Sequence, residues 1–368
     1  MSIDLKIIPL SSWFSSADSP LIISGPCGAE TEKQVMDTAF AIAALNKVHV
    51  LRAGIWKPRT RPDSFEGAGE NGLKWLLQAK KETGLKTTVE VAKAEHVELA
   101  LKYDVDILWI GARTAVNPFY VQEIADALKG VDIPVMVKNP LNPDLQLWIG
   151  ALERINRAGI HKLIAIHRGF FSNSNSTYRN SPHWQIPIEL MQLIPDLPVI
   201  CDPSHIAGKR DLILQLAQQA LDLKMCGLMI ESHIDPDHAL SDSQQQLTPY
   251  ALGEVLESLV VRKEKSDNIE FQNTLELLRK KIDKIDHHLV ETIASRMKIV
   301  DKIGDYKRDH NVTILQLERW AQIINDRIPY GSTLELNPEF VKLLFQLIHD
   351  ESIRIQTEIM NNSVEVKP

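Results

Sequence analysis

The amino-acid sequence predicts a (β/α)8 TIM barrel followed by a separate all-α three-helix domain. Three observations lead to this α/β fold class. Eight short apolar runs alternate with stretches of helical period over about the first 260 residues. Reactive side chains follow these runs and do not precede them. Beyond Arg262 the chain becomes highly charged, and after that segment only helical periodicity remains.

Each of the eight runs is short enough for one strand, and several are almost continuously apolar. Strands that are covered by helices on both faces of a parallel sheet have this composition. The intervening stretches, such as 32–46 and 212–223, have helical period. This repeated alternation favours a closed barrel over an open doubly wound sheet. The predicted strands are 21–23, 49–51, 86–91, 106–110, 133–137, 162–166, 198–201 and 227–230.

Reactive side chains occur directly after every one of these strands. In a barrel the carboxyl ends of the strands form one rim, where catalytic groups are collected from separate strands. Surface charges scattered at random would have no reason to keep this phase. The residues are Cys27, Arg52, Glu90, Arg113, Lys138, His167, Arg168, Asp202, His205, Glu231 and His233.

One set of residues at this rim could bind a metal. It offers a sulfur, an imidazole nitrogen and two carboxylates, a mixture that suits one divalent transition metal ion such as Mn, Fe, Co or Zn. A lone buried cysteine or histidine is more often structural, but the joint pattern favours a ligand set. The candidate ligands are Cys27, His205, Glu231 and Asp242.

A second set is cationic. Although the chain has a formal net charge of -7, residues 51–62 (LRAGIWKPRTRP) contain four cations. Arginine can grip a phosphate or carboxylate with its planar fork and lysine acts as a point charge, so we expect a small-anion site, with a solvated basic loop as the alternative. The full set exceeds what one phosphate requires and therefore favours two anionic substrates. Its members are Arg52, Lys57, Arg59, Arg113, Lys138 and Arg168.

Composition excludes several classes of protein. The chain has three cysteines, no stretch of 18 apolar residues and no N-terminal apolar run flanked by positive charge. We therefore expect a cytoplasmic protein without a membrane partner. The acidic balance and the lack of a basic stripe argue against a nucleic-acid partner.

The remaining sequence predicts a linker at 262–272, between a barrel domain at 1–261 and a helical domain at 273–362. Apolar spacing predicts one helix of about 35 residues, a second from Ile314 that Pro329 and Gly331 stop, and a third with Asn337 as its cap. Polar side chains within this pattern could line a pocket, although a dimerising helical tail would have the same periodicity. They are Arg279, Arg296, Lys307, Arg319, Ser352 and Gln356.

The barrel motifs resemble 3-deoxy-D-arabino-heptulosonate-7-phosphate (DAHP) synthase of the type I beta group. The motifs are LRAGIWKPRT, IGAR, the strand end at Lys138, HRG, DPSH, IESH and ALSDSQQQL. Sister enzymes that make the eight-carbon sugar acid typically have a KANRS-like run in place of KPRT, so the resemblance implies erythrose 4-phosphate as the acceptor. One departure is Asn139 in VKNP, and Arg179 in STYRNS is either a sugar-phosphate contact or a solvated loop residue.

The resemblance also implies roles for individual residues. The metal ligands would be the four named above, with His205 also among the catalytic candidates beside Lys57 and Glu90. Arg59 and Thr60 would bind the aldose phosphate. The remaining cations would bind phosphoenolpyruvate, namely Arg52, Lys57, Arg113, Lys138 and Arg168.

The helical part resembles the all-helical chorismate mutase, an intertwined dimer. The resemblance rests on the segments LELLRKKIDKIDHHLVETIASRMKIVDKIGDYK and LFQLIHDESIRIQ. In that family two arginines hold the dicarboxylate, and the positions of Lys307 and Gln356 face the ether oxygen. Arg279 lies about 100° from Arg296 in helical azimuth, so it would serve the other subunit. The departures are Gln316 and Trp320, where the family commonly has acids near the substrate hydroxyl.

Together these resemblances imply a bifunctional shikimate-pathway enzyme, whose ligands are phosphoenolpyruvate, erythrose 4-phosphate, chorismate and prephenate. We expect a homodimer through the helical domain, with higher oligomers left open. Two alternatives are a Schiff-base aldolase that uses Lys138 and a non-catalytic helical module that senses chorismate or prephenate. Many type I beta relatives carry a separate N-terminal effector-binding domain, but the 20 residues before the first predicted strand are too few for one. A sensor would therefore lie elsewhere, and we expect prephenate in the mutase site to inhibit the synthase.

Overall fold

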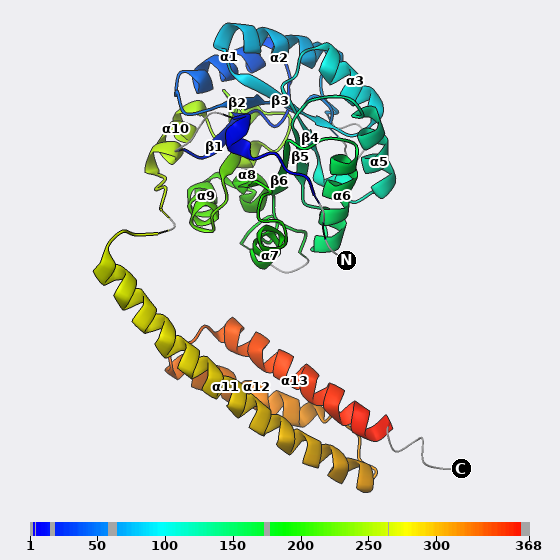
Figure 1. Cartoon of the computed structure of the whole chain (residues 1–368), viewed down its shortest axis with the longest axis vertical. Coiled ribbons are helices and arrows are strands. Elements are labelled where there is room, and N and C mark those ends of the chain that lie inside the picture. The colour runs from blue at the N-terminus through cyan, green and yellow to red at the C-terminus, as the bar shows by residue number, and fades with distance from the viewer. Residues whose placement is uncertain are drawn as a thin grey trace. The chain divides into compact units, whose positions relative to one another are not determined.

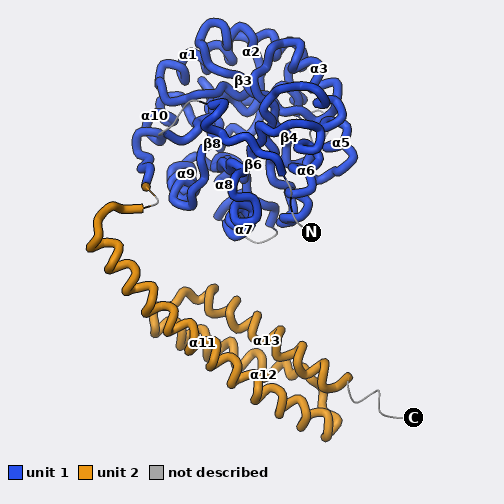
Figure 2. The backbone as a smooth tube through the Cα atoms, in the orientation of Figure 1, with its two compact units in different colours: residues 1–262 blue, residues 263–368 orange. Residues whose placement is uncertain are grey.

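The structure is a computed structural model that describes residues 3, 5–14, 19–57, 65–172, 177–263 and 265–361. It divides into two compact units, residues 1–262 and 263–368, which Figure 2 distinguishes by colour. None of the helices in the described ranges is both long enough and apolar enough to cross a membrane.

The first unit is a closed barrel of eight parallel strands in sequence order, completed by pairing between the first and last strands. This confirms the predicted fold class, and every predicted strand coincides with an observed one to within two residues at either end. The strands are β1 (Leu21–Gly25), β2 (Val50–Arg52), β3 (Lys86–Val91), β4 (Ile107–Ile110), β5 (Val135–Lys138), β6 (Leu163–His167), β7 (Val199–Cys201) and β8 (Gly227–Glu231).

Helices surround the barrel (Figure 1). Local signals begin several of them: Thr31 and Asp144 accept backbone N–H bonds at the starts of α1 and α6, and Pro118 is the first residue of α5. The helices are α1 (Glu32–Ala43), α2 (Glu70–Thr83), α3 (Ala94–Lys102), α4 (Ala112–Ala115), α5 (Pro118–Ala127), α6 (Leu145–Arg157), α7 (Gln185–Leu193), α8 (Pro203–Ala207), α9 (Ile213–Asp222) and α10 (Pro249–Ser258).

Side chains alternate between the barrel interior and the helix-covered outside. Val50, Met136 and Met229 belong to the cluster that fills the interior, whereas their sequence neighbours belong to the outer core. Because side chains along a strand repeat every two residues, the polar residue two positions beyond each of them also points inward. This phase directs Arg52, Lys138 and Glu231 into the mouth of the barrel.

The second unit contains α11 (Ile269–Asp309), α12 (Leu317–Thr333) and α13 (Pro338–Asn361). Helix α11 is 41 residues long and begins inside the predicted linker 262–272, because Asn268 accepts a hydrogen bond from the backbone of Phe271 and caps it there. The prediction that Pro329 and Gly331 end the second helix is wrong, since α12 continues to Thr333. Gly331 packs so closely on Val341 that a Cβ would lie 2.6 Å from it, and this packing holds the last turn of α12 against α13.

Candidate active sites

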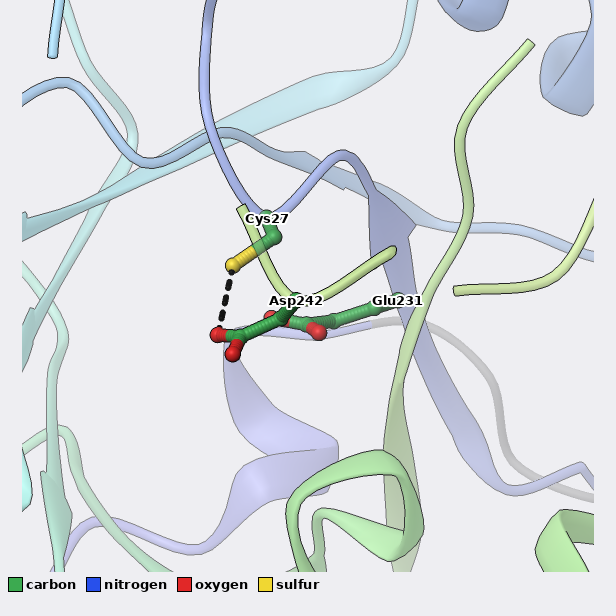
Figure 3. Close-up of side chains that lie close together, drawn as sticks. All are labelled: Cys27, Glu231 and Asp242. Carbon is green, nitrogen blue, oxygen red and sulfur yellow. Dashed lines mark hydrogen bonds between the residues drawn. The ribbon is translucent and has the colours of Figure 1, made fainter. Parts of the chain in front are cut away.

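Three of the four predicted metal ligands meet at the mouth of the barrel (Figure 3). Donor atoms of Cys27, Glu231 and Asp242 all lie within 4.8 Å of one another. Cys27 Sγ is 3.2 Å from Asp242 Oδ2. Glu231 ends β8, Cys27 lies two residues beyond β1, and Asp242 follows on the segment after β8 with a left-handed φ of 47°. Strands adjacent in the closed barrel therefore bring together residues that are more than 200 positions apart.

His205, the fourth predicted ligand, lies beside this cluster and is not part of its compact group. Its Nε2 is 3.9 Å from Glu231 Oε1, and its Nδ1 is 2.8 Å from Asp202 Oδ2. Burial lowers the pKa of His205 even though Asp202 opposes the shift, so the ring is neutral. A proton held on Nδ1 by Asp202 leaves the lone pair of Nε2 directed toward Glu231, as in metal-binding histidines supported by a carboxylate.

The chemistry of these residues fits a divalent transition metal. They offer sulfur, oxygen and imidazole nitrogen, and Glu231 Oε1 is buried with only the Arg52 ion pair at 3.1 Å and no well-aligned hydrogen bond among the described residues. Burial, with Glu231 adding to it, raises the pKa of Cys27 to about 12, so the thiol is neutral until a cation binds. Lys57 does not face open solvent: its Nζ donates to Cys27 Sγ at 2.8 Å and to the Cys27 carbonyl at 2.7 Å.

Two cations flank the indole of Trp109 inside the barrel. Arg52 Cζ lies 5.0 Å and Lys138 Nζ 6.0 Å from the ring centroid. Arg52 Nη2 is 3.1 Å from Glu231 Oε1, but its Nε and Nη1 are buried with no acceptor in the described part of the chain. Buried unpaired N–H groups are costly, so these donors mark a place for an anionic ligand. Lys138 Nζ donates to Asp202 Oδ2 at 2.7 Å.

The other predicted barrel residues lie around these groups. Arg168 is buried and donates to Asn180 Oδ1 at 2.7 Å. Burial, opposed by Asp202, lowers the pKa of Arg168 to about 10. Glu90 lies against Gly111, where a Cβ would come within 1.8 Å of its carboxylate oxygen, so only glycine fits there. Arg113, on α4, is exposed. Arg59 and Thr60 lie outside the described residues.

In the helical unit, four predicted residues form a row along α11 and α13, here called the polar stripe: Arg296, Lys307, Ser352 and Gln356. Arg296 Nη1 donates to Ser352 Oγ at 2.8 Å, and Gln356 Nε2 donates to the Ser352 carbonyl at 3.2 Å. Gln356 Oε1 is buried and has no donor among the described residues. Lys307 Nζ donates to the Ile314 carbonyl.

Two predicted residues of the helical unit do not join the stripe within one chain. Arg279 is exposed on the N-terminal half of α11. Arg319 is also exposed, donates to Gln322 Oε1 at 3.3 Å, and lines a separate cavity of about 530 Å³ together with Gln316 and Glu318.

Comparison with known proteins separates the chain into two matched parts. Residues 10–267 match the model of the DAHP synthetase I family. The chain belongs to this family. Residues 278–357 match the model of chorismate mutase type II, so a DAHP synthase domain is followed by a chorismate mutase domain.

Relatives agree with the synthase assignment. The phospho-2-dehydro-3-deoxyheptonate aldolase of Thermotoga maritima is 34% identical over 226 residues, which cover 61% of this chain and 64% of that protein. The match therefore spans less than two thirds of that relative. A 2-dehydro-3-deoxyphosphooctonate aldolase of Alkalilimnicola ehrlichii is 27% identical over 264 residues, covering 66% of this chain and 91% of the relative.

A solved structure of the Thermotoga maritima phospho-2-dehydro-3-deoxyheptonate aldolase (DAHP synthase) superimposes with a TM-score of 0.61 at 29% identity, covering 69% of this chain and 75% of that one. A truncated form of the Thermotoga maritima 3-deoxy-D-arabino-heptulosonate 7-phosphate synthase gives a TM-score of 0.57 at 28% identity, covering 66% and 85%.

Several contacts to the candidate ligands in the DAHP synthase domain were not predicted, including those of Arg179, for which the sequence left open a sugar-phosphate contact or a solvated loop position. Arg179 Nη1 donates to Asp242 Oδ1 at 2.9 Å and to Gln245 Oε1 at 2.7 Å. Gln245 Nε2 in turn donates to Glu231 Oε2 at 2.7 Å, and Gln246 Oε1 accepts from the Cys27 backbone at 2.8 Å. The glutamine run after Asp242 was a partial signal: Gln245 and Gln246 are buried and need hydrogen-bond partners, whereas Gln244 is exposed.

The departure at Asn139 has a structural explanation in this DAHP synthase domain. Asn139 is fully buried, and its Oδ1 accepts from the Arg168 backbone N–H at 2.7 Å. Its Nδ2 donates to the Gly169 carbonyl at 2.8 Å. The amide thus joins the ends of β5 and β6 and orients the backbone that carries Arg168.

Proposed function

We propose that the chain is bifunctional. The barrel would condense phosphoenolpyruvate with erythrose 4-phosphate to give DAHP and inorganic phosphate, and the helical domain would rearrange chorismate to prephenate. The observation that carries the first activity is the Cys27, Glu231 and Asp242 cluster beside the unpaired donors of Arg52. An electrophile site and an anion site are thereby adjacent in a buried mouth.

The metal ligands in this proposal are Cys27, His205, Glu231 and Asp242. A divalent ion held by them would supply Lewis-acid polarisation of the aldehyde oxygen. Asp202 serves the same site indirectly, because it keeps His205 in one tautomer and neutralises Lys138.

The chain's own side chains supply binding and orientation. Arg52, Lys138 and Arg168 would hold the carboxylate and phosphate of phosphoenolpyruvate, with Arg113 at the rim. Arg59 and Thr60 would hold the aldose phosphate. C3 of phosphoenolpyruvate forms a bond to the aldehyde carbon, water adds at C2, and the C–O bond breaks so that phosphate leaves with its bridging oxygen. Lys57 and Glu90 are the candidates that position this water.

In the mutase domain, the polar stripe would bind chorismate. Its arginine would hold the dicarboxylate, and Lys307 and Gln356 would face the ether oxygen. The rearrangement needs no acid, base or nucleophile, so oriented charges in a fixed pocket suffice. Arg279 would complete the site of a second copy. Supporting a homodimer, the exposed N-terminal half of α11 presents apolar side chains that are about half exposed or more, among them Leu278, Ile282 and Ile285.

Phosphate release from phosphoenolpyruvate plus erythrose 4-phosphate, with and without a chelator, tests the synthase activity. A Schiff-base aldolase would resist the chelator and would be trapped at Lys138 by borohydride. The 2.7 Å contact with Asp202 disfavours that alternative, since it engages the Lys138 amine with a buried carboxylate. Chorismate consumption tests the mutase activity, and a ligand-sensing module would bind chorismate without turning it over.

We further propose that prephenate in the mutase site inhibits the synthase. Supporting this, one chain carries both domains, and the described residues between Ser258 and Ile269 form neither helix nor strand. A ligand that prefers one arrangement of the domains shifts their population, and barrel ligands must then alter prephenate affinity by the same factor. Prephenate should inhibit the full chain but not a truncated chain that ends at Val261. Equal inhibition of both would refute the proposal.

A further inference from the structure

A pair of stacked rings joins α12 to α13 in the mutase domain. The ring centroids of Trp320 and His349 lie 4.1 Å apart with an angle of 19° between their planes. Trp320 occupies one of the two positions where the chorismate mutase pattern has an acid near the substrate hydroxyl. Gln316, at the other position, is exposed and lines the separate cavity that Arg319 also lines. The two acids that the resemblance implies for that hydroxyl are therefore both absent from their positions.

His349 lies on the same face of α13 as the polar stripe. At 100° per residue, His349 and Gln356 differ by about 20° in azimuth, and Ser352 lies about 60° from His349. Burial lowers the pKa of His349, and the nearby Arg296 guanidinium adds to this lowering against the opposite influence of Asp350. The imidazole is thus neutral near neutral pH and offers one N–H donor and one acceptor nitrogen.

The ring nitrogens of His349 are available to a ligand. Within the described part of the chain, no hydrogen bond reaches either nitrogen, and neither one is sealed from solvent. On the same face, Gln356 is 8% exposed, and its Oε1 is buried without a donor. An unpaired buried amide oxygen is an independent sign that this face of α13 meets a polar ligand.

We propose that His349 hydrogen-bonds the ring hydroxyl of chorismate, with Trp320 holding the imidazole in place. This assignment rests on the proposed mutase function. His349 would replace, from α13, the carboxylates that the family pattern places at 316 and 320. Stacking on Trp320 restricts the imidazole to one plane, so that its edge and not its face is presented to the pocket.

The test compares two substrates in the full-length chain: chorismate and an analogue without the ring hydroxyl, which can undergo the same rearrangement. His349→Leu removes both ring nitrogens, and His349→Gln restores a donor and an acceptor. His310→Leu is the matched control, because His310 also stacks on a neighbour, Tyr306 at 4.5 Å, but lies in the exposed C-cap of α11. Circular dichroism and thermal unfolding verify that each variant is folded.

We expect His349→Leu to lower kcat/KM for chorismate about tenfold, the loss typical of one uncharged hydrogen bond at the upper end of its range. His349→Gln should recover most of this loss, and His310→Leu should show none. For the analogue, wild type and His349→Leu should be equally active. An equal loss with both substrates, or an unaffected His349→Leu, would overturn the assignment. A wild-type chain that consumes no chorismate would instead overturn the mutase function itself.

Discussion

Replacing Asp202 with asparagine tests how the barrel organises its metal site. Asp202 is fully buried, and its carboxylate contacts Lys138 Nζ at 2.7 Å and His205 Nδ1 at 2.8 Å. Its Oδ1 also accepts from the His205 backbone at 3.1 Å and so begins α8. Burial by itself would raise the pKa of Asp202, but His205 and Lys138 hold it well below its usual range. The side chain is therefore a buried anion shared by two partners.

Asparagine keeps the shape but removes the charge. The variant can no longer stabilise the Nδ1–H tautomer of His205 as an anion does, and such support is worth about 10–100-fold in metal affinity. Lys138 is 6% exposed at its side chain and would be left buried beside a neutral amide. Breaking a buried ion pair costs about 3–5 kcal/mol, and we expect about 3 kcal/mol here because the amide oxygen still accepts one hydrogen bond.

The assay is metal titration of the stripped chain by calorimetry, together with denaturant unfolding. The matched control is Asp132→Asn, which breaks a similar contact with Lys162 at 2.7 Å where Asp132 is exposed. An exposed pair contributes about 1 kcal/mol or less, and the control should leave metal affinity unchanged. If Asp202→Asn binds metal as tightly as the wild type, Asp202 does not govern the tautomer of His205 and the argument fails.

Three further predictions concern the same domain. Cys27→Ala should abolish synthase turnover while chorismate turnover persists; turnover in the metal-stripped wild type would contradict the ligand assignment. Arg59→Ala should raise KM for the aldose phosphate far more than for phosphoenolpyruvate, and equal effects would contradict the division of cations. Burial, with Lys93 adding to it, lowers the pKa of His96 to about 4, so the stability contributed by its neutral ring should be lost as pH falls from about 6.5 to 4. His96→Phe, which can keep the 4.0 Å stack on Trp56, should remove this part of the pH dependence of thermal unfolding, and an unchanged profile would refute the attribution.

Much of the barrel was predictable because its signals are local. A strand covered on both faces is apolar along its length, so the ILWI run within residues 106–110 predicts a strand, and β4 spans Ile107–Ile110 with all four residues buried. The rim residues were predictable for the same reason. The end of an apolar run marks the end of a strand, and residues directly beyond it lie at the rim of the barrel. Alternation of side chains also separates His167 from Arg168: Ile164 and Ile166 fill the interior, so Arg168 points inward and His167 packs outside against Trp184.

The sequence by itself thus determined the fold class, the two domains that the family models match, and the strand ends at which the candidate site residues lie. Only the tertiary structure decided how those residues pair. It places Lys57 on the sulfur of Cys27, keeps His205 outside the compact cluster, and makes Asp202 the shared partner of His205 and Lys138. The physical reason is that periodicity encodes which face a side chain takes, whereas barrel closure and helix packing set which distant side chains meet, and no local pattern records those distances.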